Sequence, residues 1–295
     1  MADNTLESIA ILGIGTMGHG MATSALRAGI PTTVWNRNPE TTRDLAETGA
    51  TVAQTAEDAA RSATIVVTMV TDADAVISIA RDEGMMAALV PGAILAQMGT
   101  IGVAGIDRVA ALAAAERPDV ILADAPVSGS KEPAEQGQLT IFASGPDEAR
   151  PRLTPLFDAL GRRTIWAGAV GSGTRLKLVA NTWLAFAAEA VAASVALAHG
   201  LGLETEMVAD ALEGNSLVSP WQEAKLQRIV KGEFSAQFAL SLALKDVRLA
   251  DQAADGRLGA LKCLAEEWQH AVDGGLGHED VTAVTRSLEE EWTRP

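Results

Sequence analysis

Two polar side chains interrupt an apolar stretch in the middle of the chain. Lys177 and Asn181 stand four residues apart, so on a helix they lie on one face, about 40° apart in projection. Burial disfavours the ammonium form of a lysine and brings its pKa towards the range useful for proton transfer. The pair predicts Lys177 as a proton donor to a carbonyl oxygen, with Asn181 orienting both groups. The alternative is a lysine that reaches solvent from a helix start.

A glycine-rich segment follows the first apolar run of the sequence. Gly13-x-Gly15-x-x-Gly18 lies between this run and a helix-forming stretch. In such a corner the first glycine permits a tight turn, the second lets a pyrophosphate approach the backbone, and the third lets helix and strand pack closely. The amides at the helix N-terminus attract the phosphates. The predicted cofactor contacts here are Gly13, Gly15, Thr16, Met17 and Gly18.

The residues after the second predicted strand indicate which dinucleotide is bound. An NAD site carries a carboxylate there, which would repel a 2′-phosphate. This chain has Asn36-Arg37-Asn38 instead. Asn36 can donate without repelling, Arg37 can hold a phosphate through two N–H groups, and Arg43 lies close enough in sequence to assist. The pattern predicts NADP(H) in preference to NAD(H), with a solvated turn as the alternative for Arg37.

A third polar cluster lies between an apolar strand and a predicted helix. It runs from Asp124 to Lys131 and contains Ser128-Gly129-Ser130. Two hydroxyl groups that flank a glycine provide a compact set of side-chain and backbone donors for a carboxylate. The cluster predicts a binding site for a small anionic substrate. The alternative is an ordinary Ser-Gly turn that caps a helix.

Short β-branched runs alternate with Ala-rich stretches in the first half of the chain, which indicates an α/β fold with a doubly wound, mostly parallel sheet of the Rossmann type. After Gly168 strand signals cease and helical patterns follow, beginning with a helix from Thr174 to about His199. We expect a Rossmann-type domain over 1–168 and an all-helical substrate and dimerisation domain over 169–295, joined by this long helix. The predicted strands are Ser8–Leu12, Thr32–Trp35, Thr64–Val70, Ala93–Gln97, Val120–Asp124, Leu139–Ala143 and Arg163–Trp166; the predicted crossover helices are Met17–Ala28, Glu40–Gly49, Ala73–Ala80 and Val103–Glu116.

Composition excludes several classes of partner. A net charge of -15 opposes binding to nucleic acid or to an anionic membrane. The apolar stretch 176–203 contains charged and polar residues, so we expect a buried helix and no membrane span. Residues 1–8 lack the pattern of a signal peptide. The single cysteine, Cys263, excludes an internal disulfide and predicts a reducing, cytoplasmic compartment. Four scattered histidines predict no metal site.

Four separated motifs together resemble the β-hydroxyacid dehydrogenase family. The glycine-rich corner, the segment 124–130, the segment 173–181 around Lys177, and Lys245-Asp246-Val247-Arg248-Leu249-Ala250 occur in the family's order and at roughly its spacing. The resemblance covers nearly the whole chain. Within the family, SGSKEPAEQGQL at 128–139 and Asn36-Arg37 are most similar to the NADPH-dependent glyoxylate and succinic semialdehyde reductase branch.

The resemblance implies reversible, NADPH-dependent reduction of a small carboxylate-bearing aldehyde, with Lys177 as the catalytic acid and base. It implies that Ser128, Gly129 and Asn181 contact the substrate, and it supports a homodimer or tetramer. The further positions that it implies are Val70 and Thr100 on the nicotinamide side, Lys245 closing over the cofactor, and Phe238 as a wall of the substrate pocket.

Three alternatives to this activity stay open. The same residues suit oxidation of 3-hydroxyisobutyrate or another short 3-hydroxy acid. Imine reductases share the layout but usually lack the helix lysine, and a non-catalytic NADP-binding module would have no use for it. Two departures from the family pattern affect the substrate: Gly99 replaces the usual serine of a Ser-Thr-Ile segment, and Trp221 places a large indole where smaller side chains are expected.

Overall fold

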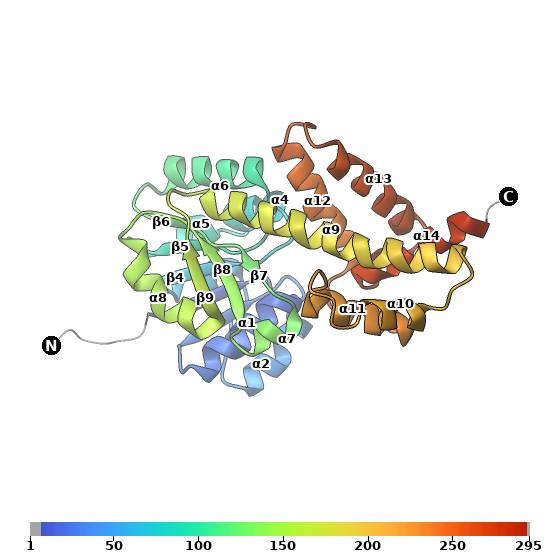
Figure 1. The fold of residues 1–295 in the computed structure, drawn as a ribbon. Helices are drawn as coiled ribbons and strands as arrows, with labels where there is room; N and C mark the ends of the chain where they lie inside the picture. The colour runs from blue at the N-terminus through green and yellow to red at the C-terminus, as the bar shows by residue number, and fades with distance from the viewer. Residues whose placement is uncertain (1–6, 294–295) are drawn as a thin grey trace. The chain divides into compact units, whose positions relative to one another are not determined.

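The computed structural model describes residues 7–293; most of the segment compared with a signal peptide lies outside them. The chain forms two compact units, the first ending at Lys177 and the second beginning at Leu178. Figure 1 shows strands with flanking helices in the first unit and helices in the second.

The first unit is built around a six-stranded sheet in which every pair of neighbours is parallel. The strand order is β3-β2-β1-β4-β5-β6. Strands β1 to β3 are added towards one edge of the sheet and β4 to β6 towards the other, so the order switches between β1 and β4. In this class of sheet dinucleotides bind in the crevice at that switch point. The predicted doubly wound fold is therefore confirmed. The strands are β1 (Ile9–Leu12), β2 (Thr32–Trp35), β3 (Thr51–Val52), β4 (Ile65–Thr68), β5 (Ile94–Gln97) and β6 (Ile121–Asp124).

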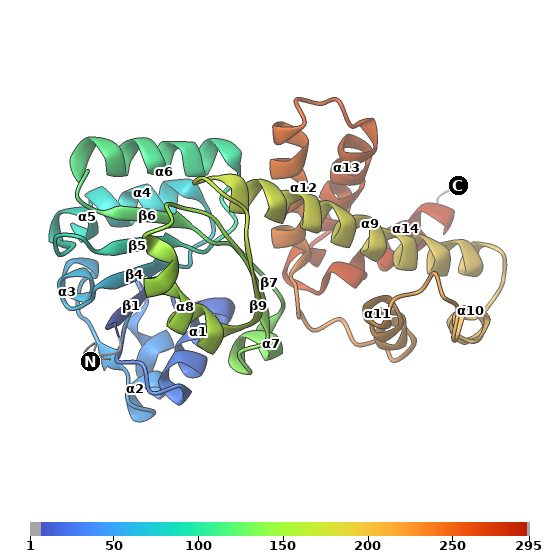
Figure 2. The ribbon, with the colours of Figure 1, turned by 60° about the vertical axis from the view of Figure 1, so that its left-hand side comes forward.

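Both faces of this sheet are buried, because alternate side chains of each strand enter different cores. Ile9 and Ile11 pack on one side, whereas Ala10 and Leu12 pack on the other. Figure 2 shows the two helical layers on either side of the strands. The first layer contains α1 (Thr16–Arg27), α2 (Arg43–Glu47) after η1 (Pro39–Thr42), α7 (Lys131–Glu135) and α8 (Ala149–Leu160); the second contains α3 (Ala56–Arg61), α4 (Ala73–Arg81), α5 (Met85–Ala88) and α6 (Val103–Glu116).

A second, three-stranded sheet completes the first unit. It consists of β7 (Val127–Ser128), β8 (Leu139–Ala143) and β9 (Gly161–Trp166), with β7 antiparallel and β9 parallel to β8. The sequence predicted β8 and β9 but not their separation from the main sheet. It also did not predict β3 and β7, since two residues are too few to show an alternating pattern.

The second unit consists of helices joined by loops. Helix α9 (Ser172–Gly200) begins in the first unit and continues into the second, close to the predicted bounds. The others are α10 (Thr205–Leu212), α11 (Pro220–Val230), α12 (Leu240–Ala253), α13 (Gly259–Asp273) and α14 (Val284–Thr293), with short turns η2 (Leu276–His278) and η3 (Val281–Ala283).

The sequence predicted α9 as a buried helix, and the structure buries only part of its surface. One side is buried and includes Ala185, Ala192 and Val195, whereas Trp183 is 81% exposed and Val179 is 68% exposed. Among the described residues α9 is the one helix with the length and hydropathy of a membrane span, a property that core helices of soluble proteins also have. The other side of α9 is an apolar surface that no other part of the described chain covers.

Candidate functional site

The glycine-rich corner connects β1 to α1, and each glycine has its own steric setting. A Cβ on Gly13, whose φ is +103°, would lie 2.4 Å from the carbonyl oxygen of Met69, and one on Gly18 would lie 2.0 Å from that of Gly13. At Gly15 no atom lies within 4 Å. Gly13 and Gly18 therefore allow close backbone packing, whereas Gly15 faces the open space that a pyrophosphate would fill. The corner fits a dinucleotide cofactor.

Asn36, at the end of β2, holds the glycine-rich corner in place. Its Oδ1 accepts a hydrogen bond from the Ile14 amide at 3.1 Å. Its Nδ2 donates to Thr41 Oγ1 at 2.8 Å and to the Asn38 carbonyl at 3.1 Å. The Asn38 side chain in turn accepts from the Glu40 amide. Asn36 and Asn38 thus shape the loop beside the corner, and both amide hydrogens of Asn36 already have protein acceptors.

Arg37 lines a cavity of about 280 Å³ beyond the end of β2. It is exposed, and no hydrogen bond or ion pair to it occurs among residues 7–293. Arg43, by contrast, pairs with Glu40 at 2.8 Å. The guanidinium of Arg37 is therefore available to an anion. The cavity is lined by Trp35, Asn36, Arg37, Pro39, Thr42, Val52, Ala53, Gln54, Thr55 and Glu83.

Val70 and Thr100 occupy the loops after β4 and β5, which are neighbouring strands. The two loops approach closely at Gly99, where a Cβ would lie 2.4 Å from the Val70 carbonyl oxygen. Gln97 supports the second loop, accepting from the Gly99 amide at 2.9 Å and donating to its carbonyl at 2.8 Å. The glycine that departs from the family pattern is thus the residue that lets these loops meet.

The Ser128-Gly129-Ser130 cluster joins β7 to α7. Gly129 has φ +146°, and a Cβ there would lie 2.6 Å from Leu139 Cδ2, so the turn requires glycine. Ser130 is the N-cap residue of α7, but its side chain makes no capping hydrogen bond. Both serines are half-buried. The capping alternative therefore does not account for the hydroxyl of Ser130.

Asp124, at the end of β6, anchors the start of α9. Its carboxylate accepts from the Thr174 amide at 2.8 Å and from the Thr174 hydroxyl at 2.7 Å. Ser144 Oγ donates to the Asp124 carbonyl and accepts from the Gly173 amide at 2.9 Å. Burial raises the pKa of Asp124, although these hydrogen bonds oppose the shift. Lys177 follows within the first turns of α9 and is buried, with 7% of its surface exposed.

In the second unit Asn181 on α9 is joined to Asp246 on α12. Asn181 Nδ2 donates to Asp246 Oδ2 at 2.5 Å, and Lys245 Nζ lies 3.1 Å from Asp246 Oδ1. Both Asn181 and Asp246 are buried. Our sequence reasoning quoted Asp246 in the fourth motif without giving it a role. The signal that could have indicated such a role is the position of this carboxylate directly after Lys245 within a family motif.

Phe238 lies between α11 and α12 and is half-buried. Its amide donates to Asp280 Oδ2 at 3.2 Å.

The structure gathers most of the predicted residues into two sets. The first unit brings the glycine corner, Asn36–Asn38, Val70 and Thr100 to the carboxyl ends of neighbouring strands, and the second joins Asn181 to the α12 segment. No group of three or more metal-ligating side chains occurs among the described residues.

Comparison with known proteins identifies the family. A model described as the NAD binding domain of 6-phosphogluconate dehydrogenase matches residues 8–168. A second model, described as NAD-binding of NADP-dependent 3-hydroxyisobutyrate dehydrogenase, matches residues 171–288. The chain belongs to the β-hydroxyacid dehydrogenase family. Members of this family are NAD(P)-dependent dehydrogenases that act on CH–OH groups, and this chain is one of them.

Several members of the family are similar over nearly their whole length. Glyoxylate/succinic semialdehyde reductase 1 of Arabidopsis thaliana is 30% identical, covering 95% of this chain and 98% of the relative. NAD-dependent L-serine dehydrogenase of Pseudomonas aeruginosa is 32% identical over 84% of this chain and 86% of the relative. The crystal structure of 3-hydroxyisobutyrate dehydrogenase from Salmonella typhimurium superposes with a TM-score of 0.86, at 28% identity, covering 95% and 99%.

Proposed function

We propose that this β-hydroxyacid dehydrogenase uses NADPH to reduce a small aldehyde that carries a carboxylate, of the glyoxylate or succinic semialdehyde type, reversibly to the hydroxy acid. The observation that carries the cofactor choice is Arg37, an unpaired guanidinium just after β2, where an NAD enzyme has a carboxylate. Two similar proteins named glyoxylate/succinic semialdehyde reductase, both from Arabidopsis thaliana, support the substrate class.

The proposed chemistry assigns the proton to Lys177. When bound, the nicotinamide supplies the hydride that reduces the carbonyl carbon. Lys177 Nζ delivers a proton to the carbonyl oxygen and takes it back in the reverse direction, while Asn181 orients the two groups. The amide of Gly129 and the hydroxyls of Ser128 and Ser130 hold the carboxylate. The aldehyde thus gains one hydride and one proton and becomes an alcohol.

The proposal also divides the labour between the two parts of the chain. Residues 1–168 bind NADP(H), with Val70 and Thr100 on the nicotinamide side. Residues 169–295 supply Phe238 to the substrate pocket and Lys245 to the cofactor. Cys263 is the sole cysteine of the sequence and is exposed, so no internal disulfide forms, and we place the reaction in the reducing cytoplasm.

A kinetic matrix tests this function. NADPH and NADH are each combined with glyoxylate, succinic semialdehyde, methylmalonate semialdehyde and a cyclic imine, using wild type and Lys177→Ala. We expect the highest kcat/KM with NADPH and a carboxylate-bearing aldehyde, and a fall in kcat of about 10²- to 10⁴-fold in the variant. Preference for NADH, or equal rates of the two proteins, would overturn the proposal.

The similarity to a 3-hydroxyisobutyrate dehydrogenase structure makes oxidation of a 3-hydroxy acid the second candidate. It is tested in the same assay with 3-hydroxyisobutyrate or L-serine and the oxidised cofactors. A higher kcat/KM for either compound than for the aldehydes would favour it. Imine reductases of Myxococcus stipitatus share the fold at 22% identity and a TM-score of 0.64, which supports no activity here.

We further propose that the enzyme self-associates through α9. Its exposed apolar residues repeat at alternating spacings of four and three, as in helices that pair along their length. Trp183→Glu should therefore reduce the molar mass in sedimentation equilibrium, whereas Leu258→Glu, at an exposed leucine outside α9, should not. Equal masses of all three proteins would refute the interface. The residues are Val179, Trp183, Phe186, Ala190, Ala193 and Leu197.

A further inference from the structure

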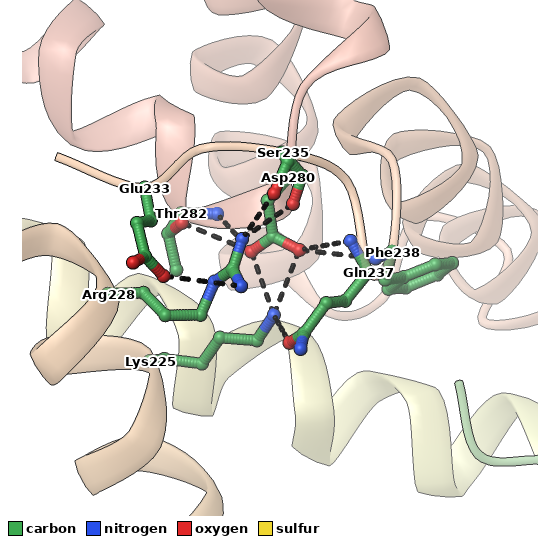
Figure 3. A network of polar contacts seen from close by, with 8 residues as sticks. All are labelled: Lys225, Arg228, Glu233, Ser235, Gln237, Phe238, Asp280 and Thr282. Carbon is green, nitrogen blue, oxygen red and sulfur yellow. Dashed lines mark hydrogen bonds and ion pairs between the residues drawn. The ribbon is translucent and has the colours of Figure 1, made fainter. Parts of the chain in front are cut away.

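A buried ion pair in the second unit has no place in the chemistry described so far. Lys225 on α11 lies 2.8 and 2.9 Å from the two carboxylate oxygens of Asp280, and their side chains are 3% and 0% exposed. Burial opposes ionisation of Asp280, but the hydrogen bond and charge of Lys225 outweigh it and lower the pKa of the carboxyl. Burial lowers the pKa of the Lys225 ammonium, and the hydrogen bond and charge of Asp280 oppose that shift. Figure 3 shows the two residues at the centre of a polar network.

The Asp280 carboxylate also holds the segment that leads into α12. Its Oδ2 accepts from the backbone amides of Gln237 at 2.9 Å and Phe238 at 3.2 Å. On the other side of the same segment, the Phe238 carbonyl accepts from the Val281 amide at 2.9 Å. The backbone of Phe238 is thus fixed through both its N–H and its C=O. Figure 3 shows the ring pointing away from the carboxylate, so the network acts on it through the backbone.

Trp221 belongs to this network as well. It precedes Lys225 by one helical turn on α11, and the Lys225 ammonium lies 5.5 Å from the centre of its indole ring, within the range of a cation–π contact. Lys225 Nζ also donates to Gln237 Oε1 at 3.1 Å. The large indole that departs from the family pattern therefore supports the lysine that pairs with Asp280.

A buried ion pair contributes little to stability compared with apolar residues of the same volume. The partly buried amides of Gln237 and Phe238, however, take as their acceptor a carboxylate that apolar residues could not replace. We propose that Lys225 and Asp280 are positioning residues that fix Phe238 and thereby set which aldehydes the enzyme prefers. This inference rests on the proposed function, in which Phe238 is a wall of the substrate pocket. It extends that function from a substrate class to the device that selects within the class.

The test compares three variants with the wild-type enzyme. Asp280→Asn removes the charge and one acceptor, Lys225→Met removes the ammonium but keeps the side-chain length, and Phe238→Ala removes the ring. Leu264→Ala serves as the matched control, because Leu264 is buried on α13 and its truncation destabilises the fold without removing a polar contact. For each protein we measure kcat and KM for succinic semialdehyde and glyoxylate, and hydrogen exchange at the amides of residues 237 and 238.

We expect the ratio of kcat/KM for the two aldehydes to change about tenfold in Phe238→Ala and in both network variants, mainly through KM. The control should lower the melting temperature and leave the ratio unchanged. Exchange at amides 237 and 238 should be faster in Asp280→Asn and unchanged in the control. These readouts separate positioning from general destabilisation, and Lys225→Met keeps the test valid if Asp280→Asn fails to fold.

Two contrary outcomes have different meanings. A changed ratio in Phe238→Ala with an unchanged ratio in both soluble network variants, or unaltered amide exchange, would overturn the positioning role and leave the proposed function intact. An unchanged ratio in Phe238→Ala would overturn the place of Phe238 in the pocket and the selectivity claim. No turnover of either aldehyde by wild type would overturn the proposed function itself.

Discussion

Asp124 and Thr174 are joined by two hydrogen bonds, one to the threonine amide and one to its hydroxyl, at 2.8 and 2.7 Å. The first residue ends a strand of the main sheet and the second lies in the first turn of α9. A carboxylate at this end of a helix also interacts favourably with the helix dipole. Within the first unit, the contact fixes the start of α9 to the end of β6. Lys177 lies three residues beyond Thr174.

Asp124→Asn tests this anchor. The amide keeps one acceptor oxygen, so one of the two buried donors of Thr174 loses its partner. The free energy of unfolding should fall by about 1–3 kcal/mol, and kcat should fall while the Kd for NADPH is unchanged, because the proton donor is displaced and the cofactor corner is not. Thr174→Ser, which keeps both bonds, is the control. A variant with wild-type kcat would show that Lys177 does not depend on Asp124.

Arg37→Ala should weaken NADPH binding about 10- to 100-fold, because a charge-assisted contact to a phosphate contributes about 1.5–3 kcal/mol. The Kd for NADH, which lacks the 2′-phosphate, should stay within about twofold by the same reasoning. Arg43→Ala is the matched control, since Arg43 already pairs with Glu40. Both constants can be measured by fluorescence titration. A parallel loss of NADH binding would contradict a role for Arg37 in reading the 2′-phosphate.

Gly99→Ser restores the residue that is usual in the family, yet we expect it to harm this enzyme. The new Cβ would lie 2.4 Å from the Val70 carbonyl oxygen, so the loops after β4 and β5 must separate. Such overpacking costs about 1–3 kcal/mol, and cofactor affinity should fall with it. Gly259→Ser, at a position with no neighbour within 4 Å, provides the comparison in thermal unfolding and NADPH titration. Unchanged stability of Gly99→Ser would mean that the loops adapt.

The parallel, doubly wound character of the main sheet could be predicted because its strands are continuous apolar runs between helical stretches. Thr32–Trp35 and Val103–Glu116 have the predicted bounds. The second sheet could not, because β7 has only two residues and pairs with a strand eleven positions further on. The burial of α9 also differs from the prediction. Its apolar composition indicated a buried helix, but composition alone does not distinguish an apolar face that packs in the core from one that is exposed in a single chain.

Site residues were predictable where the backbone conformation or a close contact requires a glycine. They were less predictable where a side chain binds a partner that is distant in the sequence. Gly13, Gly15 and Gly18 follow from a spacing within one loop. The bonds of Asp124 to Thr174 and of Asp280 to Phe238 join residues 50 and 42 positions apart. No local pattern in the sequence indicates such pairs.

Glu189 on α9 is a half-buried carboxyl that faces another acid. Its Oε2 accepts from Trp268 Nε1 at 2.7 Å. Burial raises its pKa to about 7; the hydrogen bond from Trp268 opposes this shift, whereas the neighbouring Glu267 adds to it. Because the folded pKa lies above the ordinary value of 4.5, the folded state binds a proton more readily than the unfolded state does.

Stability from Glu189 should therefore be fully present below about pH 4.5 and be lost as the pH rises through about 7. A shift of this size corresponds to about 3 kcal/mol. Glu189→Gln keeps an acceptor for Trp268 but cannot ionise, so its advantage over wild type in the free energy of unfolding should grow between pH 5 and pH 8. Glu267→Gln should lower the folded pKa of Glu189, because it removes a negative charge that raises that pKa. The loss of stability should therefore become smaller and end at a lower pH than in wild type. Urea titrations across this range decide the matter, and parallel profiles of wild type and Glu189→Gln would show that the carboxyl titrates normally.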